Sequence, residues 1–309
     1  MKKKIFLLSR IPVEFLPSKG YEIIYWARLF NGHYPLKKYL EKADSEPFPR
    51  NSSFVVRIIL GFLSDFKGIV IFTTPGTHSE HRTILSILRE KNIKILELHT
   101  GDNKITKIDE IFHKLKSFFN IENSIILENF KKNLVIRKKM AMEIEKGNIH
   151  GTSLHLDALN MASGKTVRFI SNKFNGKIRG KILLMGSPST ISIINHIENR
   201  GFSVTYTLES LLEIFLIKEE MRKSYEEFPF PSRTVGYLAE KIVKILKNVN
   251  IDGIIYLMVP LSHEFLEYEL FKEKINKPII PIEISNPWKL DKRTILRIDS
   301  FLEVLEKKL

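Results

Sequence analysis

Short segments made almost entirely of apolar side chains alternate with amphipathic segments along most of the chain. Two of the apolar segments, residues 68–72 and 253–259, contain no charged side chain. A strand that is apolar on both faces is typical of a parallel sheet with helices packed on each side. Alternating strands and helices build such a sheet one βαβ unit at a time. The sequence therefore predicts an α/β protein.

The alternation occupies both ends of the chain and is interrupted in the middle. Residues 109–180 carry apolar side chains mostly at helical spacing and show little strand character. We therefore predict two Rossmann-like lobes with parallel sheets, at residues 1–108 and 181–309, joined by a central helical connection at residues 109–180. The expected strands are residues 5–8, 20–25, 68–72, 93–98, 181–185, 203–206, 253–259 and 277–284.

The amphipathic segments predict helices between the strands. In the segment at residues 54–62, Gly61 is expected to mark the end of the helix, where glycine is common. The segment at residues 125–146 is expected to end at the glycine that follows it. The other expected helices are residues 81–90, 111–119, 190–199, 233–248, 264–273 and 293–307.

Composition excludes several classes of function. The chain has no cysteine, and this excludes disulfides, thiolate nucleophiles and iron–sulfur clusters held by thiolates. Its net charge of +14 comes from 49 Lys and Arg against 35 Asp and Glu, with the basic residues spread along the whole chain. We interpret them as a solvated surface, because no basic patch with interleaved aromatic residues predicts a nucleic-acid partner. The alternative is that the charge attracts phosphorylated ligands or acidic partners.

No segment predicts a membrane span or a secretory signal. No apolar run approaches the roughly 18 residues that a membrane helix needs. The apolar part of the N-terminus, residues 5–8, is shorter than the roughly 7–15 residues of a signal-peptide core. We therefore expect a cytoplasmic protein without a membrane partner.

Seven short segments, in order along the chain, resemble the motifs of a known family. They are residues 46–52 (EPFPRNS), 68–76 (GIVIFTTPG), 146–151 (KGNIHG), 186–188 (GSP), 250–255 (NIDGII), 278–283 (PIIPIE) and 297–303 (RIDSFLE). The family that they resemble is the 2-hydroxyacyl-CoA dehydratases, which includes benzoyl-CoA reductase and the D component of 2-hydroxyglutaryl-CoA dehydratase. The resemblance extends over nearly the full length of the chain.

The cysteines that hold a four-iron cluster in that family are missing from this chain. Glu46 stands at the first position, Pro75 or Gly76 at the second, and Leu261 or Ser262 at the third. A four-iron cluster needs several thiolate ligands. The resemblance therefore implies a homologue without this cluster.

The resemblance implies a non-redox subunit or paralogue of a dehydratase-type lyase. Such a chain would bind a CoA ester, or would pair with a homologous, cluster-bearing subunit as a heterodimer or with itself as a homodimer. The alternative is a stand-alone protein that uses the cleft between the two lobes, either to bind a small ligand or in a regulatory role. A third hypothesis is an enzyme with new chemistry around Glu46 and Arg50.

Open parallel sheets bind ligands beyond the carboxyl ends of their strands. The loop at residues 186–189 fits either a phosphate held by backbone N–H groups or a plain turn with a serine helix cap. We expect the loops at residues 73–76 and 260–263 to face a common crevice, with residues 46–52 on its wall. The expected ligand-binding residues are Ser52, Thr74, Gly76, Gly186, Ser187, Ser262 and His263.

Glu46 and Arg50 are the candidate catalytic residues, because a carboxylate replaces a cluster ligand in a loop expected to face the crevice. Beside Arg50, Glu46 would have a lowered pKa; desolvated without a partner, it would have a raised pKa and could donate a proton. The alternative is that Glu46 is a solvated remnant. The spacing of His78 and His81, with His263 in the other lobe, fits a metal ion. We interpret it as a polar helix start and predict no metal site.

Overall fold

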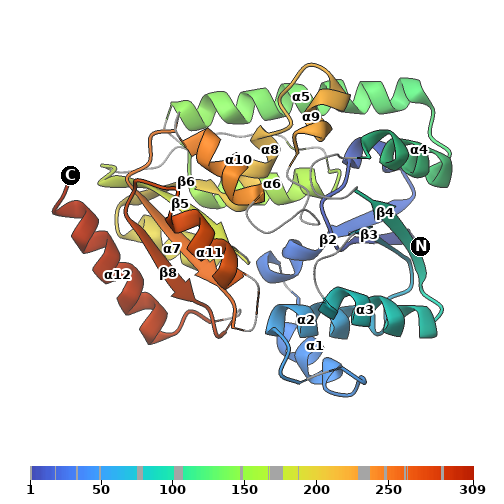
Figure 1. The fold of residues 1–309 in the computed structure, drawn as a ribbon, viewed down its shortest axis with the longest axis horizontal. Helices are drawn as coiled ribbons and strands as arrows, with labels where there is room; N and C mark the ends of the chain where they lie inside the picture. Colours follow the sequence, from blue (N-terminus) through green and yellow to red (C-terminus); the bar gives the residue numbers. More distant parts are fainter. Residues whose placement is uncertain are drawn as a thin grey trace. The chain divides into compact units, whose positions relative to one another are not determined.

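The structure is a computed structural model, drawn as a ribbon in Figure 1. It describes the chain apart from residues 1, 18, 33, 49, 75–78, 101–106, 147–148, 166, 168–176, 187, 229–236, 247–248, 261, 263 and 287–288, and apart from the side chains of residues 79–82 and 237–238.

The chain forms two compact units, and neither is one continuous stretch. Unit 1 comprises Met1–Arg137, Leu159–Val167 and Phe215–Thr234. Unit 2 comprises Lys138–Ala158, Arg168–Ile214 and Val235–Leu309. The segment expected to connect two lobes, residues 109–180, therefore contributes to both units, and unit 1 also takes in residues from the last third of the chain.

Unit 1 is built on a four-stranded sheet in which all neighbouring strands are parallel, in the order β2-β1-β3-β4. β3 lies inside the sheet, as its apolar sequence predicts. Val70 and Ile71 point to opposite faces of the sheet and are both fully buried, so helices or loops cover each face. The strands are β1 (Lys3–Leu7), β2 (Tyr21–Tyr25), β3 (Ile69–Thr74) and β4 (Lys94–His99).

The helices of unit 1 follow the strands closely in sequence. The predictions for residues 54–62, 81–90, 111–119 and 125–146 are confirmed as α2, α3, α4 and α5. The last of these, α5, continues from unit 1 into unit 2. The helices are η1 (Val13–Phe15), η2 (Trp26–Asn31), α1 (Leu36–Ala43), α2 (Phe54–Leu63), α3 (Ser79–Glu90), α4 (Ile108–Phe119), α5 (Asn123–Glu145) and α9 (Met221–Glu226).

The prediction that Gly61 ends its helix is wrong, because Gly61 lies inside α2. A Cβ atom at this position would lie 1.7 Å from the carbonyl oxygen of Tyr39 in α1. The two helices therefore touch backbone to backbone at this point, and only glycine leaves room for the contact.

A buried ion pair joins three helical elements of unit 1. Glu14 in η1 accepts a hydrogen bond from Arg137 in α5, with 3.0 Å between Nη1 and Oε1. Its other carboxylate oxygen accepts from the Tyr225 hydroxyl of α9 at 2.5 Å, and Asn133 donates to Oε1 at 3.0 Å. The side chains of Glu14 and Arg137 are 0% and 1% exposed. A fully desolvated carboxylate thus receives three donors from two distant parts of the chain.

Unit 2 repeats the architecture of unit 1 with a second four-stranded, all-parallel sheet, in the order β6-β5-β7-β8. In Figure 1 its strands are coloured yellow to red, and those of unit 1 are blue to teal. β7 lies inside the sheet, as predicted for residues 253–259. The strands are β5 (Gly180–Gly186), β6 (Phe202–Thr207), β7 (Gly253–Met258) and β8 (Ile279–Glu283). The predicted fold class, two Rossmann-like lobes with parallel sheets, is confirmed.

The helices of unit 2 match the predictions except for two: α6 lies within the predicted helical connection but was not delimited, and α8 was not predicted. α12 begins after the N-cap Asp291 and packs beside β8 (Figure 1). α6 continues from unit 2 into unit 1. The helices are α6 (Gly151–Ala162), α7 (Ile191–Asn199), α8 (Leu208–Ile214), α10 (Tyr237–Leu246), α11 (Glu264–Lys272) and α12 (Lys292–Glu306).

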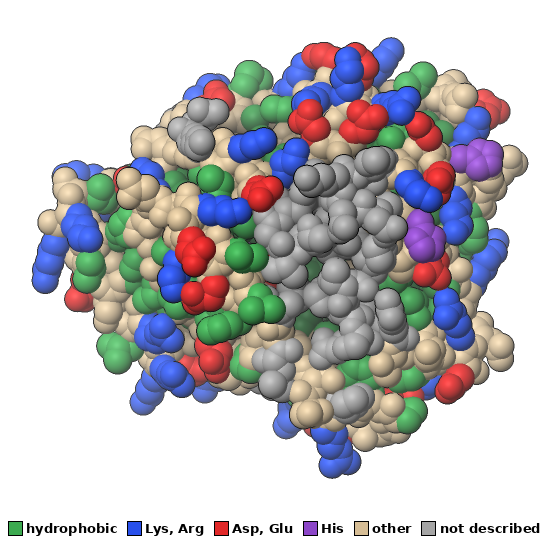
Figure 2. Space-filling model, in the orientation of Figure 1, with side chains coloured by type: hydrophobic (Ala, Val, Ile, Leu, Met, Phe, Trp, Pro, Cys, Tyr) green, Lys and Arg blue, Asp and Glu red, His purple; other side chains and the backbone are tan. Residues whose placement is uncertain are grey.

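The described surface is mixed in charge. On the face shown in Figure 2, basic side chains are interspersed with acidic ones and do not gather in one patch. Several basic residues form ion pairs with an acidic residue of the same helix, such as Lys132 with Glu128 on α5 and Lys272 with Glu269 on α11. None of the described helices has the length and the apolar character that crossing a bilayer requires.

Candidate functional site

Both sheets have the same topology, and this topology indicates where a ligand binds. After β5 the chain adds β6 on one side and then crosses over to add β7 on the other. In unit 1, β1 is followed in the same way by β2 on one side and β3 on the other. Parallel sheets bind ligands outside the carboxyl ends of the strands where the connections change direction. The residues that follow these strands are therefore the first place to look for a site.

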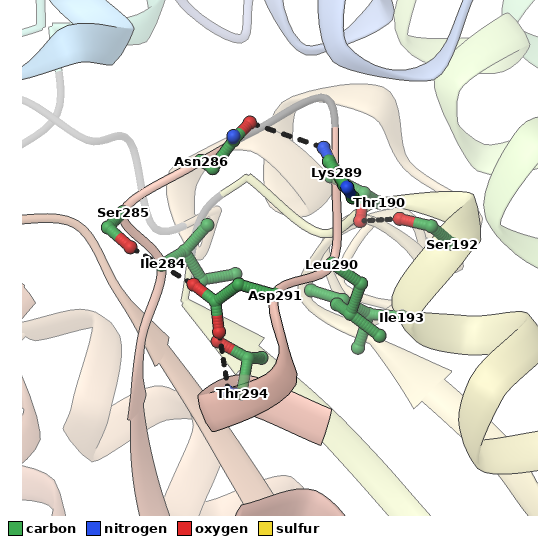
Figure 3. A pocket seen from close by; sticks show the side chains of 10 residues that line it. All are labelled: Thr190, Ser192, Ile193, Ile284, Ser285, Asn286, Lys289, Leu290, Asp291 and Thr294. Atoms are coloured by element: carbon green, nitrogen blue, oxygen red, sulfur yellow. Dashed lines mark hydrogen bonds between the residues drawn. The ribbon is translucent and has the colours of Figure 1, made fainter. Parts of the chain in front are cut away.

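Unit 2 has a pocket at the carboxyl edge of its sheet, between the start of α7 and the loop that joins β8 to α12 (Figure 3). α7 follows β5 and α12 follows β8, so both walls of the pocket come from the carboxyl ends of strands. Its empty volume, including the solvent at its mouth, is about 260 Å³. The lining residues are Thr190, Ser192, Ile193, Ile284, Ser285, Asn286, Lys289, Leu290, Asp291 and Thr294.

Polar groups face each other across this pocket. Thr190 Oγ1 and Ser192 Oγ lie 3.0 Å apart at the start of α7. On the other wall, the backbone N–H of Lys289 donates to Asn286 Oδ1 at 3.2 Å. Thr190 is only 4% exposed, whereas Ser192 and Lys289 are open to solvent. One wall of the pocket thus carries the hydroxyl groups of Thr190 and Ser192. The other carries the amide of Asn286 and the ammonium group of Lys289.

Asp291 is the one carboxylate among the described lining residues, and it serves as the N-cap of α12. Its Oδ1 accepts from the backbone N–H of Thr294 at 2.7 Å, and its Oδ2 accepts from the Ser285 hydroxyl at 3.2 Å. These hydrogen bonds, that of the Thr294 backbone first, lower the pKa of Asp291. Asp291 is therefore ionised at neutral pH. Both of its carboxylate oxygens accept hydrogen bonds from residues of the same wall, Thr294 and Ser285.

Of the predicted ligand-binding residues of unit 2, the two that the structure describes, Gly186 and Ser262, are not among the lining residues. Gly186 ends β5 with a φ of +76° and lies against β7. Ser262 donates to Glu264 at 2.5 Å, and Glu264 also accepts from the backbone N–H of Val259 at 3.0 Å. Ser262 therefore helps to fix the loop after β7. Ser187 and His263 lie outside the described residues.

The carboxyl edge of the first sheet is also polar. The Ser9 hydroxyl after β1 accepts from the backbone N–H of Thr73 at 3.3 Å. Thr100, after β4, donates to the Thr74 carbonyl through its backbone N–H at 2.6 Å and its hydroxyl at 3.0 Å. The Thr74 hydroxyl is buried and has no hydrogen-bond partner among the described residues. Ligand binding by Thr74 stays a prediction, and Gly76 lies outside the described residues.

Glu46 is paired with Lys91, which follows α3, and not with Arg50, one of the alternatives that the sequence left open. Lys91 Nζ lies 2.5 Å from Glu46 Oε1, and the Glu46 side chain is 12% exposed. Arg50 is exposed, and Ser52 is half-buried immediately before the α2 N-cap Ser53. The carboxylate of Glu46 is therefore held by a lysine within unit 1, and it is neither an unpaired desolvated acid nor a freely solvated one.

The histidine cluster considered from sequence cannot be placed. His78 and His263 lie outside the described residues, as does the side chain of His81. In the described part of the chain, no three His, Asp or Glu side chains come together in an arrangement that could hold a metal ion.

A second buried carboxylate, Glu198, lies at the end of α7 away from the pocket. Its Oε1 accepts from the backbone N–H of Gly151 at 2.6 Å, and its Oε2 lies 2.6 Å from Nδ1 of His150. Burial raises the pKa of Glu198 to about 7, although the backbone N–H groups of Gly151, Val204 and Thr152 favour the charged form. The carboxyl group of Glu198 therefore links the start of α6 to α7, and it titrates near neutral pH.

Replacing Glu198 by Gln is expected to remove a loss of stability with rising pH. The unfolded carboxyl group ionises at its ordinary pKa of 4.5, whereas the folded one keeps its proton up to about pH 7. Between these values the folded state binds more protons, so the free energy of unfolding falls as pH rises. Thermal melting between about pH 5 and pH 8 should show the wild type losing stability relative to Glu198→Gln.

An exposed acid provides the control for this experiment. Glu273→Gln, just beyond α11, makes the same chemical change at an exposed position and is the reference for the effect of the substitution itself. His150, whose Nδ1 contacts Glu198, contributes with the opposite sign, because burial lowers its pKa. A difference between wild type and Glu198→Gln that does not vary with pH would contradict the assignment.

Sequence reasoning missed the polar residues of the pocket. Thr190, Ser192 and Lys289 belong to no motif, and only the fold brings the start of α7 to the β8–α12 loop. One signal was present: Asp291 shortly precedes a predicted helix, where an aspartate is typical of an N-cap.

The fold places the protein in the class of α/β proteins with Rossmann-like parallel sheets. Comparison with known proteins adds no closer assignment: no protein-family model matches the sequence, and no curated protein matches it significantly. The resemblance to the 2-hydroxyacyl-CoA dehydratases therefore rests on the seven sequence segments alone.

Proposed function

We propose that this chain is a non-redox protein that binds a small ligand at the carboxyl edge of the unit 2 sheet. The observation that carries the proposal is the polar pocket between α7 and the β8–α12 loop, which lies where parallel sheets bind ligands. Binding is favoured over acid–base catalysis, because the carboxylate of Asp291 is committed to capping α12. The absence of cysteine supports a role without an iron–sulfur cluster.

A CoA ester is the ligand that the sequence resemblance implies, and we propose it as the first candidate. CoA carries phosphate groups, and the pocket presents hydroxyl groups and an ammonium group that suit an anion. The chain would act either as a subunit beside a homologous chain or as a stand-alone binding protein. Exposed apolar side chains on α12, Leu296 and Val304, are available to a homologous partner.

Isothermal titration calorimetry with acetyl-CoA and a 2-hydroxyacyl-CoA is expected to show saturable binding. Ser192→Trp should abolish it, because Ser192 is exposed at the mouth of the pocket and an indole would fill the entrance. Asn199→Trp adds the same side chain at the exposed far end of α7 and should leave binding unchanged. Equal loss in both variants, or no binding by the wild type, would refute the proposed ligand.

A further inference from the structure

The pocket between α7 and the β8–α12 loop is too small for a whole cofactor. Its empty space of about 260 Å³ includes the solvent at its mouth, so the enclosed part is much smaller than this figure. At most one compact group can therefore enter it, and the rest of any larger ligand would lie outside it. The chemistry of the lining then identifies the group.

The lining carries one cation that nothing in the described structure neutralises. Lys289 lines the pocket from the β8–α12 loop, is exposed, and makes no salt bridge with any described residue. The carboxylate opposite in charge, Asp291, accepts hydrogen bonds from Thr294 and Ser285 on its own wall. The ammonium group of Lys289 is thus available to a ligand.

The wall formed by α7 adds hydrogen-bond donors. The hydroxyls of Thr190 and Ser192 share one hydrogen bond, so one of their two protons is used and the other is left to donate. Thr190 is the N-cap of α7, but its side chain makes no capping bond to the helix. In Figure 3 both hydroxyls and the Lys289 side chain border the same hollow.

One wall of the pocket already holds a carboxylate of the chain itself. On the α12 wall, the Asp291 carboxylate takes a backbone N–H at 2.7 Å and a serine hydroxyl at 3.2 Å. On the α7 wall, the hydroxyls of Thr190 and Ser192 have no carboxylate beside them among the described lining residues. An external oxyanion between Lys289 and the hydroxyl pair would accept a hydroxyl hydrogen bond, as Asp291 does from Ser285.

We propose that this pocket is a binding site for one oxyanion group, a phosphate or a carboxylate, held between Lys289 and the hydroxyls of Thr190 and Ser192. The site deepens the proposed function, since it specifies which part of a ligand the pocket receives. The anion is either free in solution or the end group of a larger ligand such as a CoA ester.

Binding of inorganic phosphate, followed by NMR or calorimetry at low salt, tests the site directly. Lys289→Gln should weaken binding by about tenfold or more, since it removes one charge-assisted hydrogen bond. Asp291→Asn should strengthen binding, because it removes a negative charge from the lining while asparagine caps a helix as well as aspartate does. Lys292→Gln, on the exposed first residue of α12, is the matched control and should change nothing.

The two variants of opposite sign separate a built site from general attraction to a basic surface. Equal effects of Lys289→Gln and Lys292→Gln, or no tightening by Asp291→Asn, would overturn the inference. Titration with CoA and with dephospho-CoA distinguishes the two sources of the anion. Phosphate binding without any CoA binding would refute the proposed CoA ligand but not the oxyanion site. CoA binding that Lys289→Gln leaves unchanged would refute the oxyanion site but not the proposed CoA ligand.

Discussion

Replacing Glu14 by Gln is expected to destabilise unit 1 by about 3–5 kcal/mol, the usual effect of removing one partner from a buried ion pair. The substitution leaves the shape of the side chain unchanged and takes away the charge that lies 3.0 Å from Arg137. Neither side chain reaches solvent, so water cannot replace the lost interaction. Urea unfolding followed by near-ultraviolet circular dichroism should show a lower midpoint, because Tyr225 belongs to the same network.

A double substitution shows whether the charge or the packing is responsible. Replacing both Glu14 and Arg137 by Met removes the two charges together, and such replacements are often neutral or stabilising. Here the recovery is expected to be partial, because the buried Tyr225 hydroxyl loses its acceptor, which costs about 1–3 kcal/mol, and the half-buried Asn133 amide loses one as well. A midpoint for Glu14→Gln equal to that of the wild type would show that the ion pair does not hold unit 1 together.

Replacing Gly186 by Ala is expected to destabilise unit 2 by about 2–5 kcal/mol, from two separate causes. A φ of +76° costs a residue with a Cβ about 1–2 kcal/mol. The new methyl group would also lie 1.8 Å from the carbonyl oxygen of Leu257, and overpacking of this kind adds about 1–3 kcal/mol. β5 and β7 would have to separate at the edge where the pocket lies, so hydrogen exchange of both strands should accelerate.

Gly20 provides a control that isolates the first cause. It has a φ of +79°, and a Cβ atom there would meet nothing within 4 Å. Gly20→Ala should therefore cost only the backbone term of about 1–2 kcal/mol, in unit 1 and without any effect on β5 and β7. If the two alanine variants cost the same, the close approach of β5 to β7 would have no energetic importance.

The fold was predictable because its strands are apolar on both faces. The segments at residues 68–72 and 253–259 have no polar face, so each could only be an inner strand, and β3 and β7 are inner strands. Gly61 was misassigned because a glycine near the end of an apolar segment has the same sequence signature whether it stops a helix or admits a neighbouring backbone. Only the position of Tyr39, 22 residues earlier in sequence order, decides between the two.

The candidate site was predictable as a region but not as a set of residues. The rule for parallel sheets placed it beyond the carboxyl ends of the strands, where the pocket lies. The partner of Glu46 was not predictable, because Arg50 is near in sequence whereas Lys91 is brought in by the end of α3. Thr190 and Lys289 come together for the same reason: they are almost a hundred residues apart, and no local pattern links them.

The interleaving of the two units has a consequence for how the chain matures during synthesis. Unit 1 includes Phe215–Thr234, and Tyr225 of that segment donates to the carboxylate of Glu14. A ribosome must therefore make more than 200 residues after Glu14 before the carboxylate of Glu14 receives the hydrogen bond from Tyr225. All four strands of the first sheet are therefore translated well before unit 1 can be completed by Phe215–Thr234. Two strands of the second sheet, β5 and β6, are translated in the meantime.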